Sequence, residues 1–151
     1  MNFMSIAYEC LMSFLASLCF GIIFQVRGIK LFTAGFGGLI GWLIYLVSAP
    51  LFSSSSIPRF FFATVGITIF SELCARVLRA PVSVFLAVAL IPLVPGGGIY
   101  QTMLYCIHGN TGLALRECVS TIGIAGALAM GVVVVSSVVR LFSEWKRTYH
   151  P

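Results

Sequence analysis

Residues 91–100, which read I-P-L-V-P-G-G-G-I-Y, place two prolines and three consecutive glycines near the middle of an apolar segment. That segment, residues 81–106, is 26 residues long and carries no charged side chain. Pro92 and Pro95 lack a backbone N–H and clash with the preceding turn, so a continuous helix through this stretch is costly. Residues 96–98 are all glycine, which leaves the backbone free to adopt conformations that other residues avoid. The sequence therefore predicts a long apolar helix that is broken near its middle.

A broken apolar helix of this kind has two interpretations. In lipid, an irregular backbone survives only where protein or a water-filled cavity satisfies its polar groups. Many secondary transporters place their substrate and ion sites at discontinuous helices near the bilayer midplane. The alternative is a proline kink accompanied by glycines that allow close helix packing. The clustering of two prolines with three glycines favours a functional break, and the packing alternative stays open.

Composition places the chain in a membrane. Of its 151 residues, 60% are apolar and 9% are charged, and the mean hydropathy is +1.08. A soluble protein of this length cannot bury so much apolar surface. A net charge of +5 would suggest nucleic acid in a soluble chain, but the nine basic residues lie almost entirely beside or between apolar runs. We therefore expect the lipid bilayer as surroundings and no nucleic-acid partner.

The sequence offers no pattern typical of an enzyme or of a bound cofactor. Its five cysteines form no C-x-x-C pair and have no histidine at ligand spacing, so we expect neither a disulfide framework nor a metal site. No paired carboxylates or Ser/His/Asp set is apparent, and residues 96–98 are not followed by the Lys-Ser/Thr of a phosphate loop. Transport, if that is the function, must then draw on an ion or substrate gradient.

The predicted fold is all-α, a transmembrane helix bundle that forms one integral membrane domain over residues 1–151. A spanning helix needs about 20 mostly apolar residues. Five spans are expected, the fourth broken at the Pro/Gly stretch: residues 3–26, 31–52, 59–78, 81–107 and 113–142. A polar turn is predicted at residues 53–58 and a short tail at residues 143–151. A four-span alternative treats residues 31–52 as partly re-entrant.

The basic residues favour five spans. With this count, seven fall on one side of the membrane and two on the other. The seven are Arg27, Lys30, Arg76, Arg79, Arg140, Lys146 and Arg147, and the two are Arg59 and Arg116. Cytoplasmic loops carry an excess of Lys and Arg, so we expect a cytoplasmic C-terminus and an N-terminus outside.

Small residues at four-residue spacing give two spans faces for close approach. Gly37 and Gly41 form G-x-x-x-G in the second span, and Gly123, Ala127 and Gly131 repeat the spacing in the fifth. Helices in lipid associate through van der Waals contact, which such faces permit. We expect both faces to pack against neighbouring helices.

Four glutamates and no aspartate supply all the acidity of the chain. Glu72 and Arg76 are spaced i, i+4 on one helix face, in the order that favours an ion pair. Acids inside a membrane span are expensive and are functional candidates, so this pair is predicted to serve proton coupling or gating. The alternative is a structural pair that holds the end of the helix. Glu9, about one turn into the first span, is assigned no role.

The order of these elements resembles the threonine/serine exporter family. The resemblance lies in P-L-V-P-G-G-G-I-Y, preceded by a Pro-flanked apolar helix and followed by a short turn and a long Gly/Ala-rich helix. More closely, the chain resembles the small, separately encoded component of that family, and the specific signal is confined to residues 91–100. The resemblance implies a place in a bacterial cytoplasmic (inner) membrane and a larger membrane subunit of the same family as partner. It also implies proton-driven export of threonine and serine, or of small dicarboxylates such as succinate.

The resemblance and the break suggest one mechanism. A half-helix that begins near Gly97 would direct unpaired N–H groups and a partial positive charge at the break. Such a helix end suits the carboxylate of a small substrate. The predicted substrate-binding residues are Pro95, Gly96, Gly97, Gly98, Tyr100, Gln101 and Thr102.

Two other classes of protein stay open. A non-transporting membrane subunit would stabilise or place a partner, and its glycines would serve packing. A small channel would use the break as a filter, but one broken helix per chain then requires a symmetric oligomer.

Overall fold

The computed structural model describes the backbone of residues 3–52 and 55–149 and the side chains of residues 4–52 and 55–142. Within those ranges all regular structure is helical, as predicted. The elements are α1 (Phe3–Ile23), α2 (Ile29–Val47), α3 (Ile57–Val77), α4 (Val82–Leu90), the 3-10 helix η1 (Ile91–Leu93), α5 (Gly96–Ile107) and α6 (Thr111–Tyr149).

Five spans are compatible with these helices. Four of them, α1, α2, α3 and α6, are each long and apolar enough to cross a membrane. The fifth candidate joins Val82–Leu93 to Gly96–Ile107 through a bend of 50°, which is the predicted broken helix. Helix α2 is unbroken over its 19 residues. It therefore does not have the re-entrant form that the four-span alternative requires.

Two predicted boundaries differ from the structure. Helix α3 begins at Ile57, with Pro58 in its first turn, so the polar turn is shorter than residues 53–58. Proline suits this position because the first N–H groups of a helix have no partner inside it. Part of that predicted turn, residues 53–54, lies outside the described residues.

The predicted tail at residues 143–151 is wrong over most of its length. Helix α6 continues through these positions to Tyr149, and residues 150–151 lie outside the described range. Neither glycine nor proline occurs between Phe142 and Tyr149, so nothing in the local sequence stops the helix. The polarity of this segment therefore marks the end of the apolar span and not the end of the helix.

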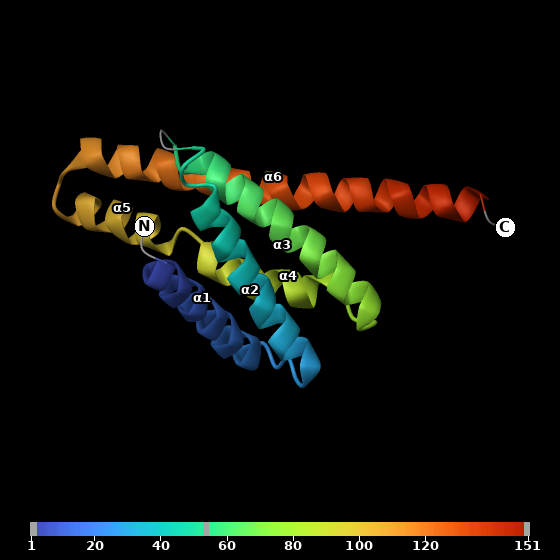
Figure 1. Ribbon diagram of the computed structural model, residues 1–151. Helices are drawn as coiled ribbons and strands as arrows, with labels where there is room; N and C mark the ends of the chain where they lie inside the picture. The colour runs from blue at the N-terminus through green and yellow to red at the C-terminus, as the bar shows by residue number, and fades with distance from the viewer. Residues whose placement is uncertain (1–2, 53–54, 150–151) are drawn as a thin grey trace.

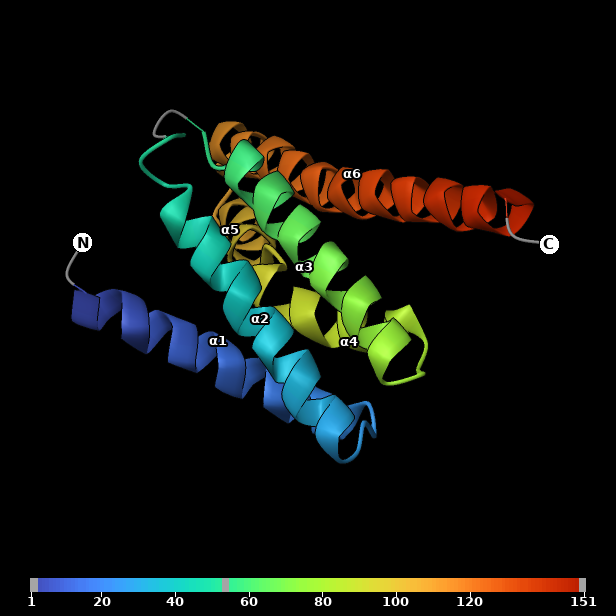
Figure 2. The same ribbon diagram turned by 45° about the vertical axis from the view of Figure 1, so that its right-hand side comes forward.

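Helix α2 lies at the centre of the bundle, between α1, α3 and α4 (Figures 1 and 2). Its glycines make this possible. A Cβ atom at Gly37 would meet Ala89 of α4, and one at Gly41 would meet both Ile67 of α3 and Leu93 of η1. Without side chains there, three neighbouring elements approach the α2 backbone closely. The prediction that Gly37 and Gly41 serve packing is confirmed.

The small residues of α6 face α3. A Cβ atom at Gly123 would meet Ile57, one at Gly131 would meet Thr64, and Ala127 between them is buried. Residue numbers rise in the same direction along both helices from the first contact to the second, so α6 runs parallel to α3. Residues 111–122 of α6 therefore extend beyond the start of α3. This packing face is also confirmed.

The turns that carry the basic residues come together at one end of the bundle. Val26, in the turn between α1 and α2, packs against the same buried cluster as Leu78 and Ala80, in the turn between α3 and α4. Arg27 and Arg79 therefore lie at the same end, as the charge count predicts.

Candidate functional site

The break in the fourth span occupies residues 91–95. Helix α4 ends at Leu90, η1 follows as a tighter turn, and Val94 is extended before α5 begins at Gly96. The two prolines account for the change, because neither Pro92 nor Pro95 can donate a backbone hydrogen bond to the preceding turn. Leu93 between them is fully buried and packs with Ala63 and Ile67 of α3. The break is thus anchored in the core of the bundle.

The start of α5 has an uncapped N-terminus. Pro95 occupies the capping position and makes no side-chain cap hydrogen bond. The N–H of Gly96 bonds to the Val94 carbonyl at 2.7 Å, whereas the N–H groups of Gly97 and Gly98 have no acceptor among the described residues. The first N–H groups of a helix carry a partial positive charge and need an acceptor. This end of α5 can therefore accept an anionic group.

The three glycines have different surroundings. Apart from the adjacent residues and the backbone of α5 itself, no atom lies within 4 Å of a Cβ built at Gly96 or at Gly97. A Cβ at Gly98, in contrast, would collide with the side chain of Thr121 on α6. The structure therefore leaves the first two positions open to a ligand and uses the third for helix packing.

The other predicted binding residues lie on the first turns of α5. Tyr100 is 63% exposed, and Gln101 is also exposed. The Thr102 hydroxyl donates to the Gly98 carbonyl at 2.8 Å, within the helix. Thr102 also lines a cavity of about 290 Å3 between α5 and α6, together with Cys106 and Cys118. The structure keeps all seven residues on one short segment, but it does not aim the side chains of Tyr100 and Gln101 into the bundle.

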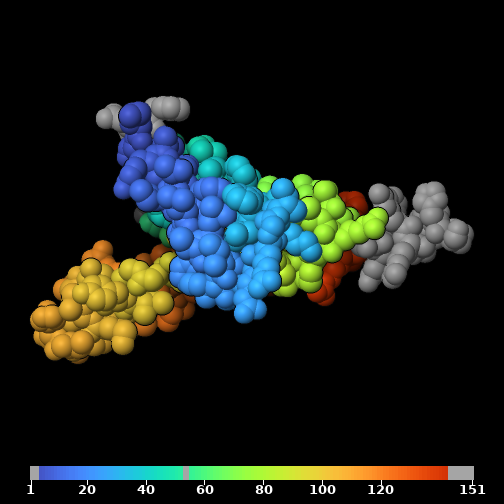
Figure 3. Space-filling view, turned by 90° about the horizontal axis from the view of Figure 1, so that it is seen from below, coloured from blue at the N-terminus to red at the C-terminus, as the bar shows by residue number. Residues whose placement is uncertain are grey.

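Helix α5 and residues 111–122 of α6 form a hairpin that projects from the bundle, and we call it the arm (Figure 3). Helix α5 packs mainly against α6 and has no buried residue. Large apolar side chains on the arm are exposed, among them Ile99, Met103, Ile107, Leu115 and Val119. The open side of the break therefore adjoins an apolar surface that the described chain leaves uncovered.

Glu72 and Arg76 lie away from the break. Leu93 packs at the level of Ile67, and Glu72 is five residues further along α3, which corresponds to about 7.5 Å. Glu72 is half-buried and Arg76 is exposed. Within the part of the chain that the structure describes, no hydrogen bond or ion pair joins the two side chains. Their spacing permits a pair that this conformation does not form.

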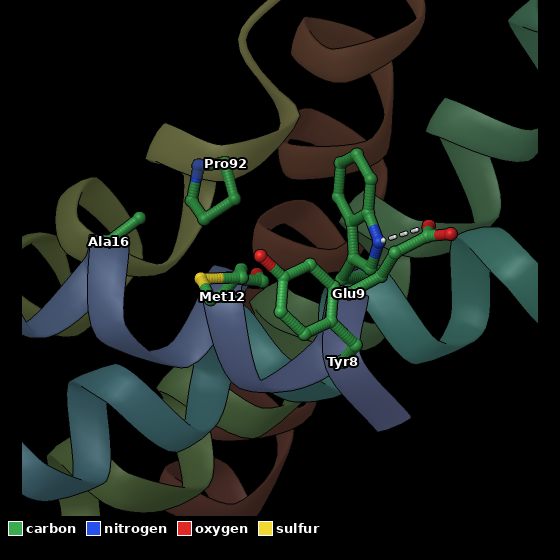
Figure 4. A pocket seen from close by; sticks show the side chains of 7 residues that line it. Tyr8, Glu9, Met12, Ala16 and Pro92 are labelled. Atoms are coloured by element: carbon green, nitrogen blue, oxygen red, sulfur yellow. Dashed lines mark hydrogen bonds between the residues drawn. The ribbon is translucent and has the colours of Figure 1, made fainter. Parts of the chain in front are cut away.

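A pocket beside the break contains a residue that the sequence interpretation passed over. Between α1, α2 and η1 lies a cavity of about 290 Å3, lined by Tyr8, Glu9, Met12, Ser13, Ala16, Trp42 and Pro92 (Figure 4). The Trp42 indole N–H donates to Glu9 Oε2 at 3.2 Å. We call this cavity the Glu9 pocket. The signal that could have found it is a glutamate inside an apolar span, which is rare unless it has a function.

The floor of the Glu9 pocket is a close approach of α1 and α2. The Ser13 hydroxyl donates to the Gly38 carbonyl at 3.0 Å. One turn further, Ser17 is fully buried against Gly38, and its hydroxyl has no hydrogen-bond partner among the described residues. Pro92 completes the contact, since a Cβ at Gly38 would lie 3.5 Å from its ring. Polar groups from two spans therefore lie beside Pro92, within the break.

Comparison with known families gives this geometry a context. The family described as "Threonine/Serine exporter, ThrE" matches residues 9–138, from the first turns of α1 to the last third of α6. The chain belongs to the threonine/serine exporter family. The resemblance carried by residues 91–100 is thereby confirmed, and the match extends over all the helices around them. A family of threonine/serine exporters is a family of transporters, which agrees with the apolar helices. No curated protein and no solved structure matches the chain.

Proposed function

We propose that this chain is the small membrane subunit of a secondary-active exporter of small carboxylate-bearing metabolites, namely threonine and serine or a dicarboxylate such as succinate. One observation carries the proposal. In a chain of the threonine/serine exporter family, the fourth span is broken at two prolines, and the helix beyond the break begins with uncapped, open glycines. This is the arrangement with which transporters bind anionic groups at membrane depth.

The substrate carboxylate binds at the start of α5. The N–H groups of Gly97 and Gly98 supply donors, and the helix end supplies a partial positive charge. The open space at Gly96 and Gly97 supports this assignment, because a carboxylate must approach the backbone closely to accept from it. Tyr100 and Gln101 serve as further hydrogen-bond donors at the rim of the site.

A larger membrane subunit of the same family completes the site. In hydrocarbon, free N–H groups and irregular backbone are tolerated only where protein or a watery cavity covers them. The start of α5 is open, and the arm beside it exposes apolar side chains. A second polypeptide that packs on the arm would bury those side chains and enclose the carboxylate site. We therefore expect the chain alone to give no efflux above background.

The proton gradient drives the exporter, and Glu72 with Arg76 carries or gates the coupling proton. The half-buried position of Glu72 near the basic end of α3 supports this role. The chain sits in the bacterial cytoplasmic membrane, with the basic turns and the C-terminus in the cytoplasm. The collection of Arg27 and Arg79 at one end of the bundle supports this orientation.

A non-transporting structural subunit is the second candidate. The observation that favours it is the contact of Gly98 with Thr121, which assigns one of the three glycines to packing.

Deletion of the gene in its native host decides between the two candidates. Cells are loaded with labelled L-threonine, L-serine or succinate, and efflux is measured with and without an uncoupler. The proposal predicts that deletion removes the uncoupler-sensitive efflux of at least one of the three, and that the wild-type gene restores it. The structural subunit predicts a different result. Deletion then removes the larger partner from the membrane, and efflux returns when that partner is restored in cells that still lack this chain.

A further inference from the structure

A groove lies beside the end of α2 and the start of α3 (Figure 2), and we call it the α2–α3 groove. Its volume of about 390 Å3 is within the range of ligand pockets. Large apolar side chains line it, and four of them are exposed, which leaves the groove open to the surroundings of the bundle. These four are Leu43, Val47, Leu51 and Phe62.

The lining of the α2–α3 groove is apolar. Of the described residues that form it, only Ser48 is polar, and its hydroxyl donates to the Ile44 carbonyl at 2.6 Å, one turn earlier in the chain. Phe52 and Phe62 stack in one wall, with ring centroids 5.4 Å apart. Removal of apolar surface from water or from a polar ligand is favourable. The lining therefore suits a hydrocarbon chain.

One cation lies beside this apolar lining. The Arg59 Nε–H donates to the Phe52 carbonyl at 2.9 Å, so the guanidinium is held against a residue of the groove wall. Among the described residues, no other group accepts a hydrogen bond from Arg59, and no carboxylate pairs with it. A guanidinium has five N–H donors in a planar fork that matches a phosphate group. Four donors of Arg59 therefore remain for an anion.

The position of Arg59 in its helix also calls for an anion. Arg59 is the third residue of α3, and the first turn of this helix contains no acidic residue. The start of a helix carries a partial positive charge, so a cation there is unfavourable unless an anion lies close to it. Arg59 is half-buried as well, which adds to the cost of an unpaired charge. An anion bound to Arg59 offsets both costs.

We propose that the α2–α3 groove binds an acyl chain of a membrane phospholipid and that Arg59 holds the phosphate of the same molecule. A phospholipid joins a hydrocarbon chain to a phosphate anion, which are the two ligands that the groove and Arg59 suit. The groove is also at the right depth. The candidate spans α2 and α3 end and begin at Val47 and Ile57, so Arg59 lies at the level of the lipid headgroups. Basic residues between membrane helices bind such headgroups.

The proposed lipid lies at the end of the bundle opposite to the basic turns. It contacts α2, α3 and the turn between them, so its binding stabilises this end of the α2–α3 contact. The lipid site is separate from the start of α5. The inference therefore goes beyond the proposed function and does not depend on it.

The first test measures lipid binding by the purified full chain in detergent. A ligand that binds only the folded chain raises its thermal midpoint. Dioleoylphosphatidylglycerol is titrated into the micelles, and the mole fraction that gives half of the maximal rise is determined. Arg59→Gln removes the positive charge, and Arg116→Gln on the arm is the matched control. Dioleoylglycerol, which lacks the phosphate, and glycerol 3-phosphate, which lacks the chains, are separate probes.

The second test fills the groove. Val47→Trp puts a large ring at a position that lines it, and Val133→Trp on α6 is the matched control. The two valines are similarly exposed, at 61% and 57%, but Val133 does not line the groove. Both variants change only an exposed position, so their thermal midpoints without added lipid should stay close to that of the wild type.

The lipid should raise the midpoint of the wild type with saturation. Arg59→Gln should raise the half-saturating mole fraction about ten- to hundredfold, the strength of a hydrogen bond to a charged group. Arg116→Gln and Val133→Trp should leave it unchanged, and Val47→Trp should abolish the saturable rise. Dioleoylglycerol should bind the wild type as weakly as the phospholipid binds Arg59→Gln. Glycerol 3-phosphate should cause no shift. If Arg59→Gln does not fold, Val47→Trp with its control still tests the groove.

Several results would overturn the inference. Equal half-saturating fractions in Arg59→Gln and the wild type would remove Arg59 from the site, and equal losses in Arg59→Gln and Arg116→Gln would reduce the effect to net charge. Saturable binding that survives in Val47→Trp would place the lipid elsewhere. A full shift with glycerol 3-phosphate would identify a site for soluble anions instead of lipid. None of these results involves efflux, so each leaves the proposed function as it stands.

Discussion

Adjacent glycines at the start of α5 have different roles. Successive residues of a helix point about 100° apart, so neighbours in sequence face different surroundings. Gly97 faces open space, whereas Gly98 faces Thr121, whose hydroxyl donates to the Glu117 carbonyl at 2.7 Å. A methyl group at Gly98 forces Thr121 to move and to give up that hydrogen bond.

Gly98→Ala should therefore lower the stability of the α5–α6 contact by about 1 kcal/mol, the usual value of one hydrogen bond. The thermal midpoint of the purified chain in detergent measures this loss once the gain in helix propensity, for which Gly126→Ala is the control, has been subtracted. Thr121→Ala removes the colliding hydroxyl, so the double variant Gly98→Ala, Thr121→Ala should be more stable than the sum of the two single changes predicts. Strict additivity of the two changes would show that the contact does not exist.

At this scale the sequence predicted positions but not partners. The Pro/Gly stretch is sufficient to place the start of α5 near Gly97, because proline and glycine act locally. The bond between Glu9 and Trp42 joins residues 33 positions apart and depends on how α1 and α2 pack. No local pattern reports such a contact, and Glu9 was therefore left without a role.

Among the elements, α2 decides how closely the bundle packs. Its glycines lie against α1, α3, α4 and η1, and a Cβ at Gly41 would collide with Ile67 and lie 3.0 Å from Leu93. Leu93 is also the residue that anchors the break. A larger side chain at Gly41 would therefore disturb both the core of the bundle and the segment before α5.

Gly41→Ala should destabilise the bundle by about 1–3 kcal/mol, the usual cost of extra methylene volume in a packed core. Gly126→Ala on α6 is the matched control, because no atom lies within 4 Å of its Cβ position. The control should be neutral or slightly stabilising, since alanine favours helix more than glycine does. The thermal midpoints of the two variants are compared in the same detergent. Equal midpoints would contradict the packing described for α2.

The length of the membrane spans and the length of the helices depend on different properties of the sequence. The spans were predicted from apolar length, which the bilayer thickness imposes, and the structure has a helix or a bent helix pair at each of them. The end of α6 was not predicted, because a loss of apolar character was interpreted as the end of a helix. Helix propensity continues through residues 143–149, where no glycine or proline intervenes.

The molecule as a whole is a bundle with an arm, and the charge distribution gives it an orientation. The basic turns lie at one end of the bundle, and the arm extends beyond the start of α3 at the other. The two helices of the arm follow one another in sequence, but the packing of α3 against α6 joins distant parts of the chain. The sequence therefore did not show that the arm projects from the bundle and has an open side. The seven-to-two distribution of basic residues, in contrast, could be predicted from the order of the spans in the sequence alone.

This orientation leads to a prediction for reporter fusions. A reporter joined after Tyr149 should be active only if it functions in the cytoplasm, because most basic residues lie on the side of that terminus. A reporter joined within residues 108–110, in the turn between α5 and α6, should be active only outside the cytoplasm. Activity on the opposite side at either position would refute the assigned topology.

The central claim is that the open glycines of α5 bind the substrate carboxylate, and Gly97→Leu tests it most directly. The new side chain enters open space in this chain, so membrane abundance should stay normal, as it should for the control Gly126→Leu. At matched abundance in the native host, Gly97→Leu should raise the half-saturating threonine concentration for efflux about ten- to hundredfold, the loss expected for one charge-assisted hydrogen bond. The control should leave it unchanged. A half-saturating concentration that is the same in Gly97→Leu and in the wild type would contradict the account.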